Sequence, residues 1–163
     1  MDNTSIRTAH PIYEDVLALL TAAGIGMVID QNASIAGAAG GCQAECGTAA
    51  GMAAAALVEL ADGTPAMIGT AAALAIKNLL GLVCDPVAGL VEVPCVKRNG
   101  FATVVAMTAA DMTLAGIESV IPVDEVIAAY YDLIPDPAHP DQQVDVTAAR
   151  PVIGGRSARD RKS

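Results

Sequence analysis

Apolar residues dominate this chain, but charged residues interrupt them at short intervals. The longest stretches without a charge are residues 16–29, 31–44 and 63–76, each 14 residues long. A helix that crosses a bilayer needs about 20 apolar residues in succession. The pattern therefore favours a soluble protein with buried helices, and we expect no membrane-spanning segment.

The apolar side chains are unusually small. Hydrophobic residues make up 53% of the 163 residues, yet aromatic residues make up only 2%. Ala, Val, Leu and Ile must therefore supply most of the core, and small side chains suit helices that pack closely. The length fits one domain with a sizeable core. The formal charge of −9 disfavours nucleic acid as a partner, because a face that neutralises phosphates needs clustered Lys and Arg.

Helical signals follow one another along the first half of the chain. Apolar residues spaced three and four apart predict a first helix, which Gly24 and Gly26 should interrupt. A second, alanine-rich helix is expected over residues 42–61. The pair Thr64-Pro65 predicts a third helix, with a cap followed by proline at its first position, ending at Gly81. The first stripe consists of Tyr13, Val16, Leu17 and Leu20.

Two further helices are expected in the second half. The fourth should begin near residues 97–99 and end at Gly116. The fifth should begin at Pro122, with acidic residues in its first turn where the helix dipole favours them. Residues 82–94 carry two prolines and a glycine, which predicts an ordered but irregular connection. The residues that the fifth helix should bury are Val123, Val126, Ile127, Tyr130 and Ile134.

These signals predict an all-α fold, because no strand-like alternation persists for more than a few residues. We expect a compact Ala/Gly-rich domain of about five helices, with an irregular loop that carries a cysteine. The domain should span residues 13–134, after a flexible N-terminal segment at residues 1–12. Residues 135–163 are polar and rich in proline, so they are expected to form a mobile tail.

The chain has four cysteines and no secretory signal at its N-terminus. The expected compartment is therefore the cytoplasm, where thiols stay reduced. Cysteines in such a protein are poor candidates for disulfides and better candidates for metal ligands, catalysis or core filling. The four are Cys42, Cys46, Cys84 and Cys95.

Three of these cysteines lie near expected helix ends. Cys42 stands at the glycine-rich entry to the second helix, Cys84 in the irregular connection and Cys95 at the far end of that connection. Backbone N–H groups are free at helix starts and stabilise anions, including iron-sulfur clusters held by thiolates. The spacing alone is weak support for a metal site, because tight C-x-x-C pairs are absent, and on spacing alone buried structural cysteines are favoured.

The number of ligands would decide the chemistry of such a site. Cys46 lies one turn after Cys42, so four cysteines could form a closed, structural zinc site. Three cysteines would leave one iron of a cubane cluster without a protein ligand. That iron could bind a substrate oxygen as a Lewis acid.

Three long segments resemble a known family. They are NASIAGAAGGCQAECG at residues 32–47, KNLLGLVCDPVAGLVEVPCVKRN at residues 77–99 and AADMTLAGIESVIPVDEVIAAYY at residues 109–131. These segments resemble the alpha chain of the bacterial iron-sulfur L-serine dehydratases, in particular the two-chain type. The resemblance extends over residues 13–134, about three quarters of the chain.

The resemblance implies a cofactor and a reaction. Cys42, Cys84 and Cys95 would be the three ligands of a 4Fe-4S cluster, and Cys46 would be a small core side chain. The family members are lyases that deaminate L-serine to pyruvate and ammonia, a step of amino-acid degradation and gluconeogenesis. The open iron would act as a Lewis acid on the leaving hydroxide, so pyridoxal phosphate would not be needed.

The matched motifs also contain candidate substrate-binding residues. These side chains could hold the carboxylate of serine or donate hydrogen bonds to cluster sulfurs. Alternatively, Asn99 could cap the fourth helix, and the two cations beside it could be surface charges. The general base is not assigned, since His10 and His139 lie in polar terminal stretches outside the matched motifs. The candidates are Asn32, Ser34, Lys97, Arg98 and Asn99.

The resemblance also bears on partners. The alpha region of the family is longer on its N-terminal side, where we expect loops that help to bind substrate. We therefore expect L-serine as ligand and, as partners, a beta chain, the remaining N-terminal half of an alpha chain, or both, in an oligomer. The alternative is a truncated non-catalytic remnant or a self-associating helical module.

Overall fold

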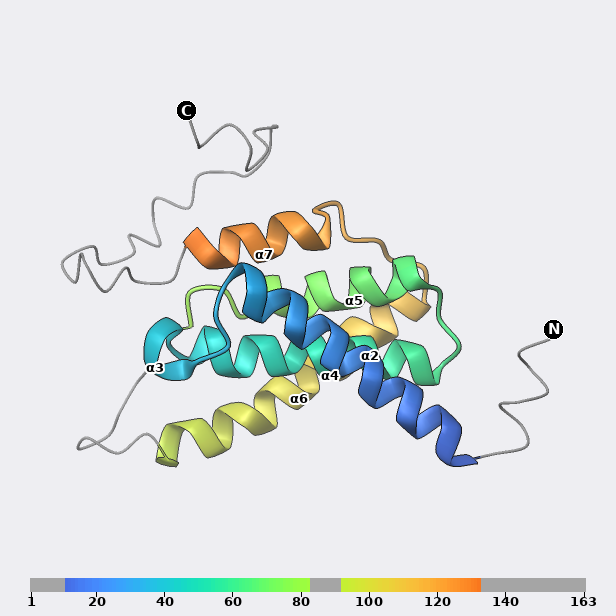
Figure 1. Ribbon diagram of the computed structural model, residues 1–163, viewed down its shortest axis with the longest axis horizontal. Coiled ribbons are helices and arrows are strands. Elements are labelled where there is room, and N and C mark those ends of the chain that lie inside the picture. Colours follow the sequence, from blue (N-terminus) through green and yellow to red (C-terminus); the bar gives the residue numbers. More distant parts are fainter. Residues whose placement is uncertain (1–10, 83–91, 133–163) are drawn as a thin grey trace.

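The computed structural model describes residues 11–82 and 92–132 (Figure 1). The N-terminal residues 1–10, most of the expected irregular connection and the expected tail lie outside this part of the chain. Within the two described ranges the chain forms helices and no strand, which confirms the predicted all-α class. The elements are α2 (Pro11–Asn32), α3 (Gly37–Gly40), the π-helical turn η1 (Gln43–Gly47), α4 (Thr48–Leu60), α5 (Pro65–Lys77), α6 (Glu92–Leu114) and α7 (Val123–Asp132).

Helix α4 lies near the middle of the bundle and contacts α2, α5 and α6 (Figure 1). Alanines fill most of the core between α4, α5 and α6, with Val58 and Leu74 as the larger side chains. Because an alanine projects only a methyl group, the helices pack closely without large voids. The prediction of a core built from small side chains is confirmed. The buried alanines of this cluster are Ala50, Ala54, Ala71, Ala75, Ala102, Ala106, Ala109 and Ala110.

A second core cluster joins α7 to α2 and α5. Ile29 of α2 and Ile76 of α5 meet the apolar face of α7, and all these side chains are at most 3% exposed. Tyr130 is the largest buried side chain of the cluster. Three of the residues predicted to be buried on the fifth helix are buried, namely Val126, Ile127 and Tyr130. Val123 packs against the cluster while partly buried, and Ile134 lies outside the described residues.

Helix α2 continues through the two glycines that were expected to interrupt it. A Cβ atom on Gly26 would lie 2.9 Å from the sulfur of Met52 on α4, so the missing side chain lets the two helices approach closely. A glycine inside a helix costs roughly 1 kcal/mol relative to alanine. Packing against α4 offsets that cost here, and the predicted interruption was wrong.

The start of α5 agrees with its sequence signal. The Thr64 hydroxyl accepts a hydrogen bond from the N–H of Met67 at 3.3 Å, and Pro65 occupies the first helical position. The α-helix ends at Lys77, and a turn continues to Gly81.

The start of α6 was predicted too late. The helix begins at Glu92, so it includes Pro94 and places Cys95 in its first turn rather than at the end of a loop. Proline is tolerated in the first turn because the N–H it lacks would have no partner there. Asn99 therefore lies inside the helix, and its proposed role as a cap was wrong.

Helix α2 also has an exposed apolar face. Ile12, Leu19, Leu20 and Met27 are each more than 60% exposed. By length and composition its segment Ile12–Asn32 is the one described helix that could cross a membrane, and little of it is buried. The charge-free runs in the sequence did not indicate this, because the helix continues past Asp30. Core helices of soluble proteins meet the same criterion.

Candidate metal centre

Two of the three predicted ligands lie together. The sulfurs of Cys42 and Cys95 are 3.9 Å apart, although 53 residues separate them in the chain. Cys42 immediately precedes η1 and is 2% exposed, whereas Cys95 is partly buried in the first turn of α6. Cys84 lies outside the described residues, so its approach to this pair remains a prediction.

The cysteine pair sits on an unusual backbone. The segment QAECG, Gln43–Gly47, forms one turn of π-helix between Cys42 and the regular helix α4. A π turn adds a residue to the helical repeat and changes which side chains share a face, and such turns are frequent at functional sites. This turn sets the direction of the Cys42 side chain relative to the face of α4.

Residues 42–47, from Cys42 through η1, are called the cysteine turn below. Gln43 connects this turn to the chain that leads to Cys84. Its side-chain carbonyl accepts a hydrogen bond from the N–H of Gly81 at 2.8 Å, and its own N–H donates to the carbonyl of Leu82 at 2.8 Å. Gly81 has a φ of 79°, which glycine adopts without strain. Leu82, the last described residue before Cys84, is thus held beside the residue that follows Cys42.

Gln43 was not among the residues predicted to form the site. A buried polar residue next to a cysteine in an alanine-rich segment was the available signal, and Gln43 is only 6% exposed. Buried polar groups generally have hydrogen-bond partners, so the position could have been marked as a structural link. Its partner, 38 residues away, could not have been inferred from the sequence.

Arg98 and Asn99 approach the cysteines from α6. The Nη1 of Arg98 donates to the sulfur of Cys42 at 3.1 Å. The amide nitrogen of Asn99 donates to the backbone carbonyl of Cys95 at 3.0 Å, and its oxygen accepts from the thiol of Cys46 at 3.7 Å. Both candidate residues therefore contact the cysteines. The alternative interpretation of Arg98 as a plain surface charge is not supported, since its guanidinium bonds the sulfur of Cys42.

Cys46 belongs to the core. It is fully buried within the alanine cluster of α4, α5 and α6. Burial raises the pKa of its thiol, the nearby Cys42 and Glu45 raise it further, and Arg98 partly offsets them. A thiol held in its neutral form is a poor metal ligand, because metals bind the thiolate. This agrees with its interpretation as a small core side chain.

The other candidate residues make local contacts. The amide of Asn32 donates to the carbonyl of Val28 at 2.7 Å, and the hydroxyl of Ser34 accepts from the N–H of Ala36 at 3.1 Å. The carbonyl of Ser34 accepts a hydrogen bond from Tyr130. Lys97 is exposed on α6. No described hydrogen bond links these three side chains to a cysteine sulfur.

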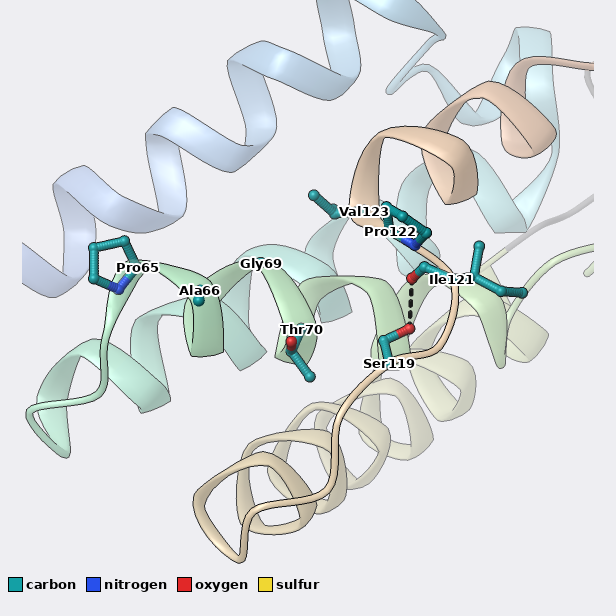
Figure 2. A pocket seen from close by; sticks show the side chains of 8 residues that line it. All are labelled: Pro65, Ala66, Gly69, Thr70, Ser119, Ile121, Pro122 and Val123. Carbon is teal, nitrogen blue, oxygen red and sulfur yellow. Dashed lines mark hydrogen bonds between the residues drawn. The ribbon is translucent and has the colours of Figure 1, made fainter. Parts of the chain in front are cut away.

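A separate cavity lies near the N-terminal half of α5 (Figure 2). It has a volume of about 260 Å³, and the hydroxyls of Thr70 and Ser119 are its polar side-chain groups. The Ser119 hydroxyl donates to the carbonyl of Ile121 at 2.6 Å. No lining residue titrates, so the cavity offers no acid or base for catalysis. Its lining consists of Pro65, Ala66, Gly69, Thr70, Ser119, Ile121, Pro122 and Val123.

The donor groups fit a thiolate-bound metal. Two thiolates on one tetrahedral ion with metal–sulfur bonds of about 2.3 Å would have sulfurs about 3.8 Å apart, close to the distance between Cys42 and Cys95. In a cubane cluster each cysteine binds a different iron, so the two sulfurs would have to separate. The described residues alone do not bring three metal-binding side chains together. A complete cluster site would therefore require Cys84.

Comparison with known proteins identifies relatives over most of the chain. The profile of the family described as "Serine dehydratase alpha chain" matches residues 5–139. The chain is 62% identical over 125 residues to a "Probable L-serine dehydratase, alpha chain" of Bacillus subtilis, which covers 76% of this chain and 42% of that protein. It is 56% identical over 110 residues to an "L-serine dehydratase, alpha chain" of Peptoniphilus asaccharolyticus, covering 68% and 38%.

A relative from Escherichia coli is also similar to this chain over only part of its own length. The chain is 49% identical over 115 residues to "L-serine dehydratase 2", which covers 70% of this chain and 25% of that protein. The matched region is therefore less than half the length of each of these curated relatives.

Proposed function

The chain belongs to the serine dehydratase alpha chain family, and from that premise we propose that it is a component of an L-serine dehydratase. The reaction is the deamination of L-serine to pyruvate and ammonia by a lyase, as part of amino-acid degradation and gluconeogenesis in the cytoplasm. Relatives with this name are longer than the matched region, so the activity would belong to an assembly that contains this chain.

In this proposal Cys42, Cys84 and Cys95 hold a 4Fe-4S cluster. The observation that carries it is that Cys42 and Cys95, 53 residues apart in the chain, bring their sulfurs to one place; binding a cubane cluster would move the two sulfurs apart from their present 3.9 Å. The hydrogen bonds of Gln43 to Gly81 and Leu82 support a short path from this pair to Cys84. The cluster would supply a Lewis acid that stabilises the departing hydroxide of serine.

The residues around the cysteines have separate tasks in this proposal. Asn99 links the thiol of Cys46 to the backbone of Cys95, which holds α6 against the cysteine turn. Asn32, Ser34 and Lys97 are proposed to bind the substrate; the ammonium group of Lys97 is exposed and suited to a carboxylate. The base that removes the α-proton of serine is not assigned to a described residue.

The proposed partners complete the substrate pocket. They are the remaining part of an alpha chain, a beta chain, or both, in an oligomer. Two observations support them: the chain spans 42% of its Bacillus relative, and α2 exposes an apolar face that another protein surface could cover.

Anaerobic reconstitution tests the cluster. The full chain is incubated with iron and sulfide, and bound iron, acid-labile sulfide and the thiolate-to-iron charge-transfer absorbance are measured. We expect about four irons and four sulfides per chain, with strong loss in Cys42→Ser, Cys84→Ser and Cys95→Ser. Cys46→Ala, one helical turn after Cys42, is the matched control and should retain the cluster.

Two outcomes would count against the proposal. Iron bound without sulfide would indicate a mononuclear site, which the 3.9 Å spacing of the two sulfurs matches. A colourless chain without iron, together with no pyruvate from serine after addition of a beta chain, would favour a non-catalytic remnant or a self-associating helical module.

A further inference from the structure

Three residues at the start of α6 share the face that meets the cysteine turn. Cys95, Arg98 and Asn99 are spaced i, i+3 and i+4, so their side chains project from the same side of the helix. All three have described contacts with Cys42 or Cys46. Lys97 is two positions from Cys95, which places it about 200° around the helix from that cysteine.

The Arg98 guanidinium supplies the positive charge at this face. It is half-buried, and its Nη1 lies 3.1 Å from the sulfur of Cys42. Its charge also lowers the pKa of Cys46, so it lies within electrostatic reach of both thiols of the turn. The described ranges contain two other cations, Lys77 and Lys97, and neither has a described hydrogen bond to a cysteine.

We propose that Arg98 is a positioning residue for the cluster and does not bind the substrate carboxylate. Its guanidinium fixes the sulfur of Cys42 through an N–H donor and offsets the negative charge of the thiolates. This inference rests on the proposed function. It assigns the two adjacent cations different roles, one at the cluster and one at the substrate. Arg98 serves the metal site, and Lys97, on another face of α6, is left for the substrate.

The charge has a measurable consequence for reduction of the cluster. An electron added to an anionic cluster is stabilised by a nearby positive charge and by hydrogen bonds to its sulfurs. Removal of the Arg98 charge should therefore make the cluster harder to reduce and lower its midpoint potential. Loss of the N–H donor to Cys42 should also reduce the amount of iron retained.

The test compares Arg98→Gln, Arg98→Lys and the control Lys97→Gln in the reconstituted full chain. Iron and sulfide content, the midpoint potential and the electron paramagnetic resonance spectrum of the reduced cluster are measured. We expect Arg98→Gln to lower the potential or to lose at least half of the iron. Arg98→Lys keeps the positive charge but lacks the planar guanidinium. Its iron content and midpoint potential should lie between those of Arg98→Gln and the wild type. Lys97→Gln removes a positive charge one residue away, and it should keep the wild-type iron content and midpoint potential.

The outcomes separate this inference from the proposed function. Wild-type iron content and potential in Arg98→Gln would overturn the inference and leave the cluster proposal intact. Equal shifts in Arg98→Gln and Lys97→Gln would also overturn it, because the effect would then be one of general charge. A wild-type chain that takes up no cluster would remove the proposed function and the inference together. If Arg98→Gln loses its helical circular dichroism, Arg98→Lys decides between these outcomes.

Discussion

Cys42 and Cys46 are one turn apart on the same segment, yet their surroundings assign them different roles. Cys46 is enclosed by core alanines, whereas Cys42 faces the sulfur of Cys95 and the guanidinium of Arg98. We predict that Cys46→Ala retains the wild-type iron content and lowers the free energy of unfolding by about 1 kcal/mol, because it removes one buried heavy atom. Iron analysis and urea unfolding measure the two effects. Iron loss as large as in Cys42→Ser would contradict this.

The pair Cys42 and Cys95 can be tested without any metal. A disulfide requires an S–S distance of about 2.05 Å, so their sulfurs, 3.9 Å apart, need only a small movement. We predict that diamide converts the metal-free chain to a Cys42–Cys95 disulfide. Each thiol gives up one hydrogen, and the oxidant is reduced to its hydrazine form. Mass spectrometry of the unreduced digest identifies the linked peptides.

The control for this oxidation is Cys46→Ser, which should form the same cross-link. Cys95→Ser should not form it. Preferential linkage of Cys42 to Cys46 would show that the two segments do not meet as the structure places them.

At the scale of single elements, the start of α5 depends on one side chain. The Thr64 hydroxyl accepts the N–H of Met67, which would otherwise lack a partner in the helix. We predict that Thr64→Ala lowers the free energy of unfolding by about 1 kcal/mol. Thr64→Ser keeps the hydroxyl and should cost much less. Thermal or urea unfolding measures both, and equal losses in the two variants would contradict the capping role.

The docking of α7 should depend on pH through Tyr130. Burial raises the pKa of its hydroxyl to about 12, and in the folded chain this hydroxyl donates to the carbonyl of Ser34. The unfolded chain releases this proton near pH 10, so the contribution to stability is complete below pH 10 and is lost as the pH rises toward 12. We predict that between pH 9 and pH 11 the free energy of unfolding falls by about 1 kcal/mol more in the wild type than in Tyr130→Phe, after allowance for solvent screening. Urea unfolding at the two pH values measures both losses. Equal losses would contradict this.

These elements show which parts of the fold the sequence could predict. The cap at Thr64 and the acidic first turn of α7 are local signals, and both helices begin where expected. The length of α2 depends on close contact between Gly26 and Met52, which no local pattern contains. The early start of α6 was missed because Pro94 was read as a loop residue although a first turn accepts it.

The candidate site likewise has parts that the sequence could predict and parts that it could not. The resemblance of the motifs around Cys42 and Cys95 implied that these residues share a site, and the structure places their sulfurs 3.9 Å apart. The choice of Arg98 for the thiol, and the link from Gln43 to Gly81, depend on contacts between segments 38 to 56 residues apart. The sequence contains the residue types for these contacts but does not specify which pairs form.

At the scale of the whole molecule, α2 has apolar residues on both of its sides. Ile29 is buried in the core, while Ile12, Leu19, Leu20 and Met27 form a stripe with helical spacing that is exposed. A helix that is apolar all round is normally covered all round, by protein or by lipid. Among residues 11–82 and 92–132 nothing covers the outer side of α2, so this face should drive association.

We therefore predict that the purified chain self-associates through the outer face of α2. A double variant, Leu19→Gln with Leu20→Gln, should weaken association at least tenfold, because it removes two apolar side chains from the centre of the stripe. Its circular dichroism should not change, since both residues are more than 60% exposed. Sedimentation equilibrium measures the association constant. Tyr131→Gln, which removes an exposed aromatic from α7, is the matched control; an equal effect there would exclude α2 as the contact. Sedimentation with lipid vesicles instead of with other copies would show that a bilayer covers this face.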